Sequence, residues 1–163
     1  MRTLEFIPGT RKALKLLASE PEEFARQYGV KPAAIAPELA RQNLEFLRMF
    51  DVAIGTEWFS YWAIEAATQE MVGVCSYKGP PVNGVVEIAY GTFDGHEGRG
   101  IATAMAQFLV DRAREAESVR IVIAHTLPVR NASCRVLEKI GMSLAGEDEE
   151  DGETVWRWEL PLR

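Results

Sequence analysis

The sequence contains little cysteine, no long apolar run and no excess of positive charge. Its 163 residues include only two cysteines, Cys75 and Cys134, which make neither a disulfide framework nor a metal-binding spacing. No apolar stretch approaches the ~20 residues of a membrane span, and residues 1–5 lack the core of a signal peptide. We therefore expect a cytoplasmic protein without a membrane partner.

The charge balance argues against nucleic acid as a partner. The net charge is -6, whereas binding to nucleic acid phosphates requires a basic face. Nucleic acid is therefore not an expected partner, although an acidic protein can attract cationic substrates. The two histidines, His96 and His125, are isolated from each other in the sequence, so we expect no metal site.

The hydrophobic periodicity predicts a mixed α/β protein, and the length fits one domain, 1–163. The early strands should be antiparallel, and one parallel, right-handed crossover should follow Thr92. The expected strands are 3–7, 58–65, 71–77, 85–92 and 119–124, then a hairpin of 143–146 with 154–160; the expected helices are 11–18, 22–28, one opening at Pro37, 101–115 and 132–140.

A glycine-rich turn connects the strand 85–92 to the helix 101–115. The segment from Gly95 to Thr103 has the sequence GHEGRGIAT. A turn that opens a helix directs free backbone N–H groups at one point, and the helix dipole makes that point electropositive. The glycines let the backbone bend tightly and approach a ligand without an intervening Cβ. These features predict a site for a phosphate or pyrophosphate.

Two common nucleotide motifs do not fit this turn. A P-loop needs Lys and then Ser or Thr after its last glycine, whereas Gly100 is followed by Ile101 and Ala102. A dinucleotide-binding motif has the order G-x-G-x-x-G, whereas this turn has Gly95-x-x-Gly98-x-Gly100. ATP and NAD are therefore not favoured as ligands.

Three segments together carry a family resemblance. The segment 97–102, EGRGIA, is similar to the cofactor motif Gln/Arg-x-x-Gly-x-Gly/Ala. The segment 125–142 is similar to a pattern Asn-x-x-Ser…Leu-Glu-Lys-x-Gly-Phe, and the segment 87–90, EIAY, to a strand with Glu-Ile-Gly-Tyr. In this order they resemble the GNAT superfamily of acetyl-CoA-dependent N-acetyltransferases, most closely the branch that includes the ribosomal-protein alanine N-acetyltransferases.

The resemblance covers roughly residues 55 to 160 and has three departures. Glu97 stands where Gln or Arg is expected, which should weaken one contact of the turn without abolishing the site. Cys134 stands at the usual Ser position, with Ser133 beside it, and Met142 replaces Phe.

The resemblance implies a GNAT fold, with a twisted, mostly antiparallel sheet of six to seven strands, one parallel crossover and about four to five flanking helices. It implies direct acetyl transfer from acetyl-CoA to a primary amine, either a protein N-terminus or a small molecule, in a ternary complex without a metal. Residues 85–142 would bind acetyl-CoA and residues 1–55 would shape the acceptor site, in a monomer or homodimer. The expected cofactor contacts are Tyr90, Thr92, Phe93, Glu97, Gly98, Arg99, Gly100, Ile101, Ala102, Thr103, Asn131 and Ser133.

Several of these residues also have a structural interpretation. Glu87 is the expected general base, but it also fits a solvent-facing or ion-paired strand residue. Asn131 suits the N-cap of the helix 132–140 as well as a cofactor contact, and Cys134 suits core packing. The acidic run 147–153 is either a solvated turn or a surface that attracts a cationic acceptor. The alternative function is a non-catalytic acyl-CoA-binding module of the same fold.

Overall fold

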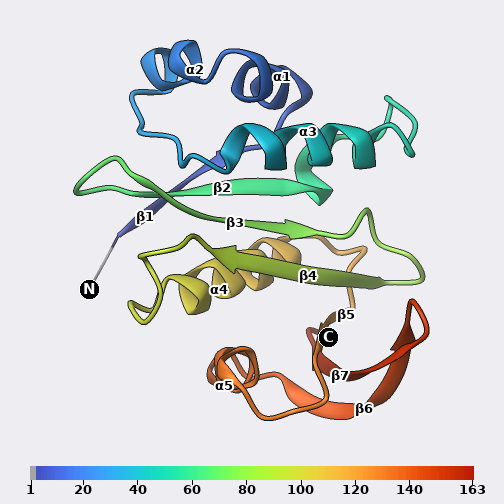
Figure 1. Cartoon of the computed structure of the whole chain (residues 1–163). Coiled ribbons are helices and arrows are strands. Elements are labelled where there is room, and N and C mark those ends of the chain that lie inside the picture. Colours follow the sequence, from blue (N-terminus) through green and yellow to red (C-terminus); the bar gives the residue numbers. More distant parts are fainter. Residues whose placement is uncertain (1–2) are drawn as a thin grey trace.

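Seven β-strands form one sheet through the centre of the described chain, residues 3–163 (Figure 1). In this computed structural model the strand order is β1-β2-β3-β4-β5-β7-β6. Neighbouring strands are antiparallel except β4 and β5, which pair in parallel, and this confirms the predicted parallel pairing after Thr92. The strands are β1 (Leu4–Pro8), β2 (Ser60–Glu65), β3 (Met71–Tyr77), β4 (Val85–Thr92), β5 (Ile121–Thr126), β6 (Ser143–Glu150) and β7 (Glu153–Pro161).

Three helices from the N-terminal part cover one face of the sheet (Figure 1). The first begins where the Thr10 hydroxyl accepts a hydrogen bond from the Ala13 N–H at 3.1 Å. The second ends at Gly29, which adopts the left-handed conformation that glycine favours after a helix. Their apolar faces pack on Trp62 and Ile64 of β2. These helices are α1 (Arg11–Ser19), α2 (Pro21–Tyr28) and α3 (Ala36–Leu47).

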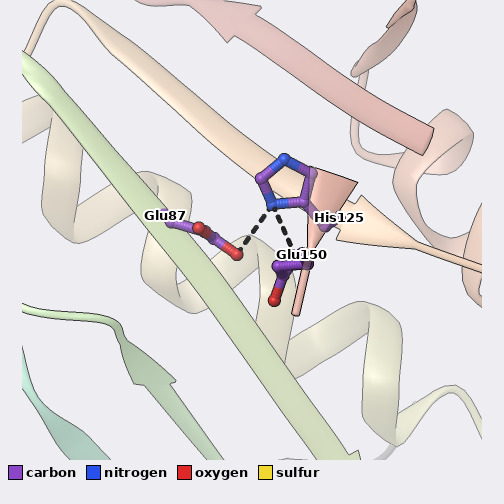
Figure 2. A group of neighbouring side chains, drawn as sticks. All are labelled: Glu87, His125 and Glu150. Carbon is purple, nitrogen blue, oxygen red and sulfur yellow. Dashed lines mark hydrogen bonds and ion pairs between the residues drawn. The ribbon is translucent and has the colours of Figure 1, made fainter. Parts of the chain in front are cut away.

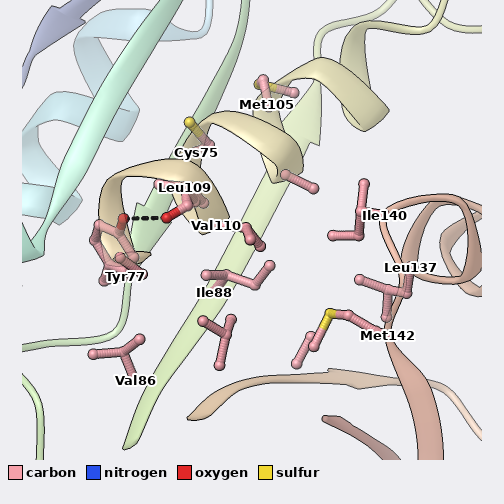
Figure 3. Close-up of a cluster of buried hydrophobic side chains, with 14 of the residues drawn as sticks. Cys75, Tyr77, Val86, Ile88, Met105, Leu109, Val110, Leu137, Ile140 and Met142 are labelled. Atoms are coloured by element: carbon pink, nitrogen blue, oxygen red, sulfur yellow. Dashed lines mark hydrogen bonds between the residues drawn. The ribbon is translucent and has the colours of Figure 1, made fainter. Parts of the chain in front are cut away.

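Side chains alternate between the two faces of β4, and this positions the site. Glu87 and Ala89 point to the face that α1, α2 and α3 share, where Glu87 lies beside residues of β5 and β6 (Figure 2). Val86 and Ile88 point to the opposite face of the sheet, where they pack with Leu109 in a separate hydrophobic core (Figure 3). That face is covered by α4 (Ile101–Glu115) and α5 (Ala132–Lys139). Within residues 3–163, no helix combines the length and the apolar character needed to cross a membrane.

β4 changes partners along its length. It pairs with β3 through its second half, and with β5 only over its first three residues, ending at the pair Glu87–Ile123. The Lys78 N–H donates to the Glu87 carbonyl at 2.9 Å, so the main-chain groups of Glu87 face β3. Because these groups alternate, those of Tyr90 and Thr92 face the β5 side, beyond the point where the β4–β5 ladder stops. This segment is a sheet edge inside the protein.

Some predicted boundaries differ by one or two residues. The strand predicted at 119–124 runs instead from Ile121 to Thr126, as β5. Val119 is buried in the turn after α4, where its N–H bonds to the Ala116 carbonyl at 3.1 Å. Trp58 was expected to start a strand, but it closes a short 3-10 turn (Thr56–Trp58), and β2 begins at Ser60. The predicted bounds of β3, β4 and α4 are confirmed.

The acidic run 147–153 is strand and not the predicted solvated turn. β6 continues to Glu150, which pairs with Glu153 of β7. Only Asp151 and Gly152 form the turn, with φ values of 51° and 79°. Positive φ at both central residues is the type I′ geometry that Asp-Gly favours in two-residue hairpins. This turn extends the hairpin and sends the acidic side chains along β6 to alternate faces.

Candidate functional site

A cleft of about 500 Å³ opens where the C-terminal end of β4 meets the first turns of α4 and α5. His96, Arg135 and Lys139 line it, although sequence reasoning did not identify them. The spacing of Arg135 and Lys139, four residues apart on one helix face, is the signal that could have found them. The expected cofactor residues that do line the cleft are Tyr90, Thr92, Glu97, Gly98, Gly100, Ile101, Ala102, Thr103 and Ser133.

The glycine turn leaves amide groups available at the cleft. Gly95, Gly98 and Gly100 have φ values of 87°, 74° and 79°, and a Cβ added at any of them would meet no atom within 4 Å. The turn therefore needs glycine for its conformation and leaves open space above the backbone. The first helical bond of α4 joins the Ala104 N–H to the Gly100 carbonyl at 3.0 Å. The N–H groups of residues 101–103 precede that bond, so the helix offers them no acceptor and an anion can bind them.

Two charged side chains of the turn contact other groups of the turn instead of extending toward the N–H groups of residues 101–103. The Glu97 carboxylate folds back, and its Oε2 accepts a hydrogen bond from the Gly95 N–H at 2.9 Å. The Arg99 guanidinium turns toward His96, with 3.5 Å between Nη1 and Nδ1, and Arg99 is not among the residues that line the cleft. Backbone amides, rather than side chains of the turn, are therefore the available donors.

Two other expected cofactor residues lie outside the lining of the cleft. Phe93 packs on the core below α1, α2 and α3, and its N–H bonds to the Val72 carbonyl at 2.9 Å. Asn131 caps α5, with its Oδ1 accepting the Cys134 N–H at 3.1 Å. Cys134 is fully buried in the core. The cap positions Ser133, in the first turn of α5, on the wall of the cleft.

A smaller pocket of about 120 Å³ adjoins the cleft. Tyr90 and Ser133 line both cavities, and Lys78, Glu87 and His125 supply the charged walls of the smaller one. Burial raises the pKa of Tyr90 to about 12, against a hydrogen bond with Ser133 that lowers it. The phenol therefore stays protonated at neutral pH and can donate a hydrogen bond at the junction of the cavities.

His125, which lines this pocket, contacts three carboxylates, of which Glu87 and Glu150 are drawn in Figure 2. His125 Nδ1 lies 3.0 Å from Glu87 Oε2 and 3.4 Å from Glu150 Oε2, and its Nε2 lies 2.8 Å from Asp148 Oδ2. Burial opposes the charged ring, but hydrogen bonds to Asp148 and Glu87 outweigh it and raise the pKa of His125 above its ordinary value. A protonated ring, with a hydrogen on each nitrogen, satisfies acceptors on both sides.

Two basic side chains extend this network. The Lys78 ammonium Nζ lies 2.7 Å from Glu87 Oε2, and Arg157 Nη1 lies 3.4 Å from Asp148 Oδ2. The hydrogen bond from His125, assisted by Arg157, holds the pKa of Asp148 below its usual range. Glu87 thus accepts hydrogen bonds from two donors, an ammonium and an imidazole.

Sequence reasoning did not identify His125, Lys78 or Arg157 as members of this network. The parallel register places Ile123 beside Glu87, so His125, two residues further along β5, points to the same face. Ligand atoms of Glu87, His125 and Glu150 lie within 4.8 Å of one another, and these donor types suit a metal ion. The Lys78 ammonium already supplies a positive charge beside Glu87. That the protein works without a metal stays a prediction.

A family model described as the acetyltransferase (GNAT) domain matches residues 7–143. The protein belongs to this family. The resemblance read from the glycine turn, the Glu-Ile-Ala-Tyr strand and the α5 segment is therefore confirmed. One relative is YjdG of Bacillus subtilis (strain 168), described as an uncharacterized N-acetyltransferase. It is 33% identical over 92 residues, a match that covers 55% of this chain and 55% of that protein.

Solved structures share the GNAT fold over nearly the whole chain. An aminoglycoside acetyltransferase in complex with coenzyme A has a TM-score of 0.67 at 16% identity, covering 98% of this chain and 95% of that one. RimL, a ribosomal-protein acetyltransferase also solved with coenzyme A, has a TM-score of 0.64 at 16% identity, covering 98% and 94%. A ribosomal-protein alanine acetyltransferase from Vibrio fischeri has a TM-score of 0.62 at 14% identity, covering 98% and 92%. These likenesses confirm the predicted fold.

Proposed function

We propose that this protein transfers an acetyl group from acetyl-CoA to a primary amine. The junction of the two cavities at Tyr90 and Ser133 is the observation that carries the proposal. One cavity contains a helix N-terminus suited to a pyrophosphate, and the other contains a carboxylate suited to proton removal. A thioester held at the junction would lie between the anion site and the base.

The cleft offers acetyl-CoA contacts along its length. The N–H groups of residues 101–103 would bind the pyrophosphate, and Arg135 and Lys139 would add positive charge. The unpaired edge of β4 at Tyr90 and Thr92 would pair with the amides of the pantetheine arm, in the manner of an added strand.

Glu87 is the proposed general base. An amine is mostly protonated at neutral pH, so a base must remove a proton before the nitrogen attacks. Glu87 is 20% exposed and is oriented by His125, and it would take this proton directly or through a water. The nitrogen then bonds to the acetyl carbon as the carbon–sulfur bond breaks. The Tyr90 hydroxyl, which stays protonated, would donate a hydrogen bond to the departing sulfur.

The acceptor would approach on the face that carries Glu87. A groove of about 300 Å³ is lined by Phe46 of α3 and by Phe59, and it reaches Lys78 and Ala89, which also line the small pocket. Lys78, at the end that the groove shares with the small pocket, contacts the Glu87 carboxylate, and a carboxylate there suits a cationic amine. A peptide N-terminus is the first proposed acceptor, and a small amine such as a polyamine or an amino sugar is the second.

A non-catalytic acyl-CoA-binding module is the second candidate function. The Lys78 ammonium contacts Glu87 at 2.7 Å, on the side from which an acceptor would come. If this ion pair persisted, an acceptor amine could not reach the base. Such a module would bind acetyl-CoA without releasing CoA.

Release of free CoA thiol in the presence of a panel of amines distinguishes the two functions. If Glu87 is the base, Glu87→Gln should lower kcat by roughly 10²–10⁴-fold while acetyl-CoA affinity, measured by calorimetry, stays the same. Glu5→Gln is the control, because it removes an exposed strand carboxylate from the far edge of the sheet. Binding without thiol release for any amine would favour the module. Binding of ATP in preference to CoA would refute both.

A further inference from the structure

Lys78 lies where an acceptor amine would have to be. Its backbone N–H donates to the Glu87 carbonyl at 2.9 Å, which fixes its main chain beside β4. Its ammonium lies 2.7 Å from Glu87 Oε2 and 3.5 Å from Glu150 Oε1. These two carboxylates converge from β4 and β6 toward one region beside His125 (Figure 2). The ammonium is therefore within hydrogen-bond distance of the proposed base.

Lys78 also lies at the boundary between the cavities. It lines both the groove beside α3 and the small pocket, and the small pocket shares Tyr90 and Ser133 with the acetyl-CoA cleft. The amine is thus on the acceptor side of Glu87, and the proposed thioester is on the cleft side. The Lys78 side chain is 41% exposed, and its flexible four-carbon stem permits movement toward the junction.

We propose that the protein acetylates itself on Lys78, with acetyl-CoA as the donor. This inference rests on the proposed function. The Lys78 ammonium gives a proton to Glu87, and its nitrogen then attacks the acetyl carbon of the thioester. A nitrogen–carbon bond forms, the carbon–sulfur bond breaks, and the acylated nitrogen gives its second proton to the leaving thiolate. The products are Nε-acetyl-lysine, free CoA thiol and the proton that Glu87 passes to solvent, and no further reactant is needed.

The ion pair makes this reaction slow, and conversion of the Lys78 amine to an amide limits it to one event per chain. Burial disfavours the ammonium, but the hydrogen bond to Glu87 outweighs burial and raises the pKa of Lys78, so the neutral amine is scarce at neutral pH. Acetylation removes the charge and with it the salt bridge to Glu87. The base then becomes available to an external amine. Self-acetylation would in this way prepare the protein for turnover.

The other lysines provide internal controls. Lys12, Lys15 and Lys31 are exposed and line neither the cleft nor the small pocket. Lys139 is exposed and lines the cleft itself, but it is not among the residues of the small pocket that holds Glu87. Uncatalysed acetylation would follow exposure and proximity to bound acetyl-CoA. It would therefore label Lys139 at least as fast as Lys78.

The test is incubation of the purified full chain with isotope-labelled acetyl-CoA, followed by intact mass measurement and peptide mapping. The intact mass is measured first, because label enters only chains whose Lys78 is unmodified. The expected result is one acetyl group per chain, on Lys78, with a first-order rate constant independent of protein concentration. Glu87→Gln should slow labelling by roughly 10²–10⁴-fold, whereas Lys31→Arg should leave it unchanged. Chains isolated with acetyl-Lys78 in the parent, but not in Glu87→Gln, would support the same conclusion.

A second readout follows turnover of an external amine. Parent protein should release CoA after a lag that disappears on preincubation with acetyl-CoA, whereas Lys78→Arg, which cannot accept the group, should show no effect of preincubation. Label spread over the exposed lysines, or equal labelling in Glu87→Gln, would overturn the proposal. Unlabelled Lys78 in a protein that acetylates an external amine would overturn it while leaving the proposed function intact. Absence of acetyl-CoA binding by calorimetry would overturn both.

Discussion

Replacing Gly100 by alanine should separate the backbone strain of the turn from its role in binding CoA. Gly100 is the N-cap of α4, with φ 79° and ψ 7°. An L-residue in this left-handed region costs roughly 1–2 kcal/mol. No protein atom lies within 4 Å of the added Cβ, so no clash increases this cost. At about 2–4 °C per kcal/mol for a chain of this size, Tm should fall by roughly 2–8 °C.

The CoA affinity of Gly100→Ala should fall further than the stability cost alone would require. The new methyl group enters the space above the turn, where a pyrophosphate would contact the N–H groups of residues 101–103. A hydrogen bond to a charged group contributes about 1.5–3 kcal/mol. Since about 1.4 kcal/mol is a tenfold change, loss of one such bond should weaken Kd by roughly tenfold to a hundredfold.

Gly29→Ala is the matched control. Gly29 ends α2 with φ 66°, and a Cβ there also meets no atom within 4 Å, but the residue is not in the lining of the cleft. Scanning calorimetry should show similar decreases in Tm for the two variants, and titration calorimetry should show weaker CoA binding only for Gly100→Ala. If a folded Gly100→Ala protein bound CoA as tightly as Gly29→Ala does, the anion would not lie at this turn.

Two further outcomes are expected from the acidic face of the sheet. Because the folded protein raises the pKa of His125 from 6.5, its protonation stabilises the fold fully below pH 6.5 and the contribution is lost as pH rises through the raised pKa. The difference in unfolding free energy between the parent and His125→Gln, measured in urea, should therefore shrink with rising pH, and a difference that grew with pH would contradict the network with Asp148. Glu147 and Glu149 alternate with Asp148 and Glu150 along β6 and point away from His125, so changing Glu147, Glu149 and Asp151 to Gln, Gln and Asn tests only the long-range field of these charges: CoA affinity should stay unchanged, and KM for a cationic acceptor should rise at low salt, with the effect shrinking at high salt. An unchanged KM at low ionic strength would mean that these exposed carboxylates do not attract the acceptor.

The sequence predicts best those parts of the site that local chemistry dictates. The bounds of α4 follow from the glycine turn and from apolar spacing, and Gly100 lies at the N-terminus of this helix as predicted. The cap at Asn131 follows from its side chain, which accepts the Cys134 N–H. Both depend on residues that are neighbours in sequence, so an amino-acid pattern specifies them.

The polar network depends on contacts between distant segments, which no local pattern specifies. His125 meets Glu87 only because the β4–β5 register places Ile123 beside Glu87, and the apolar alternation of each strand decides which face a residue lies on but not which residues stand opposite each other. Asp148 and Glu150 reach His125 because β6 extends to the Asp-Gly turn. The Asp151-Gly152 dipeptide is the sequence signal for the position of this turn, but it lies within a run of acidic residues that resembles a longer solvated loop.

The change of partner along β4 leaves main-chain hydrogen-bonding groups unpaired within the sheet. A strand with unpaired main-chain groups is a template for pairing with another chain, and natural proteins normally keep such edges at the margin of a sheet and guard them there. Here the open stretch around Tyr90 and Thr92 lies in the middle of the strand order, between β3 and β5. In the proposed complex the pantetheine arm completes the sheet at this point. The co-substrate would then serve as a temporary piece of secondary structure, protecting backbone that the polypeptide itself leaves uncovered.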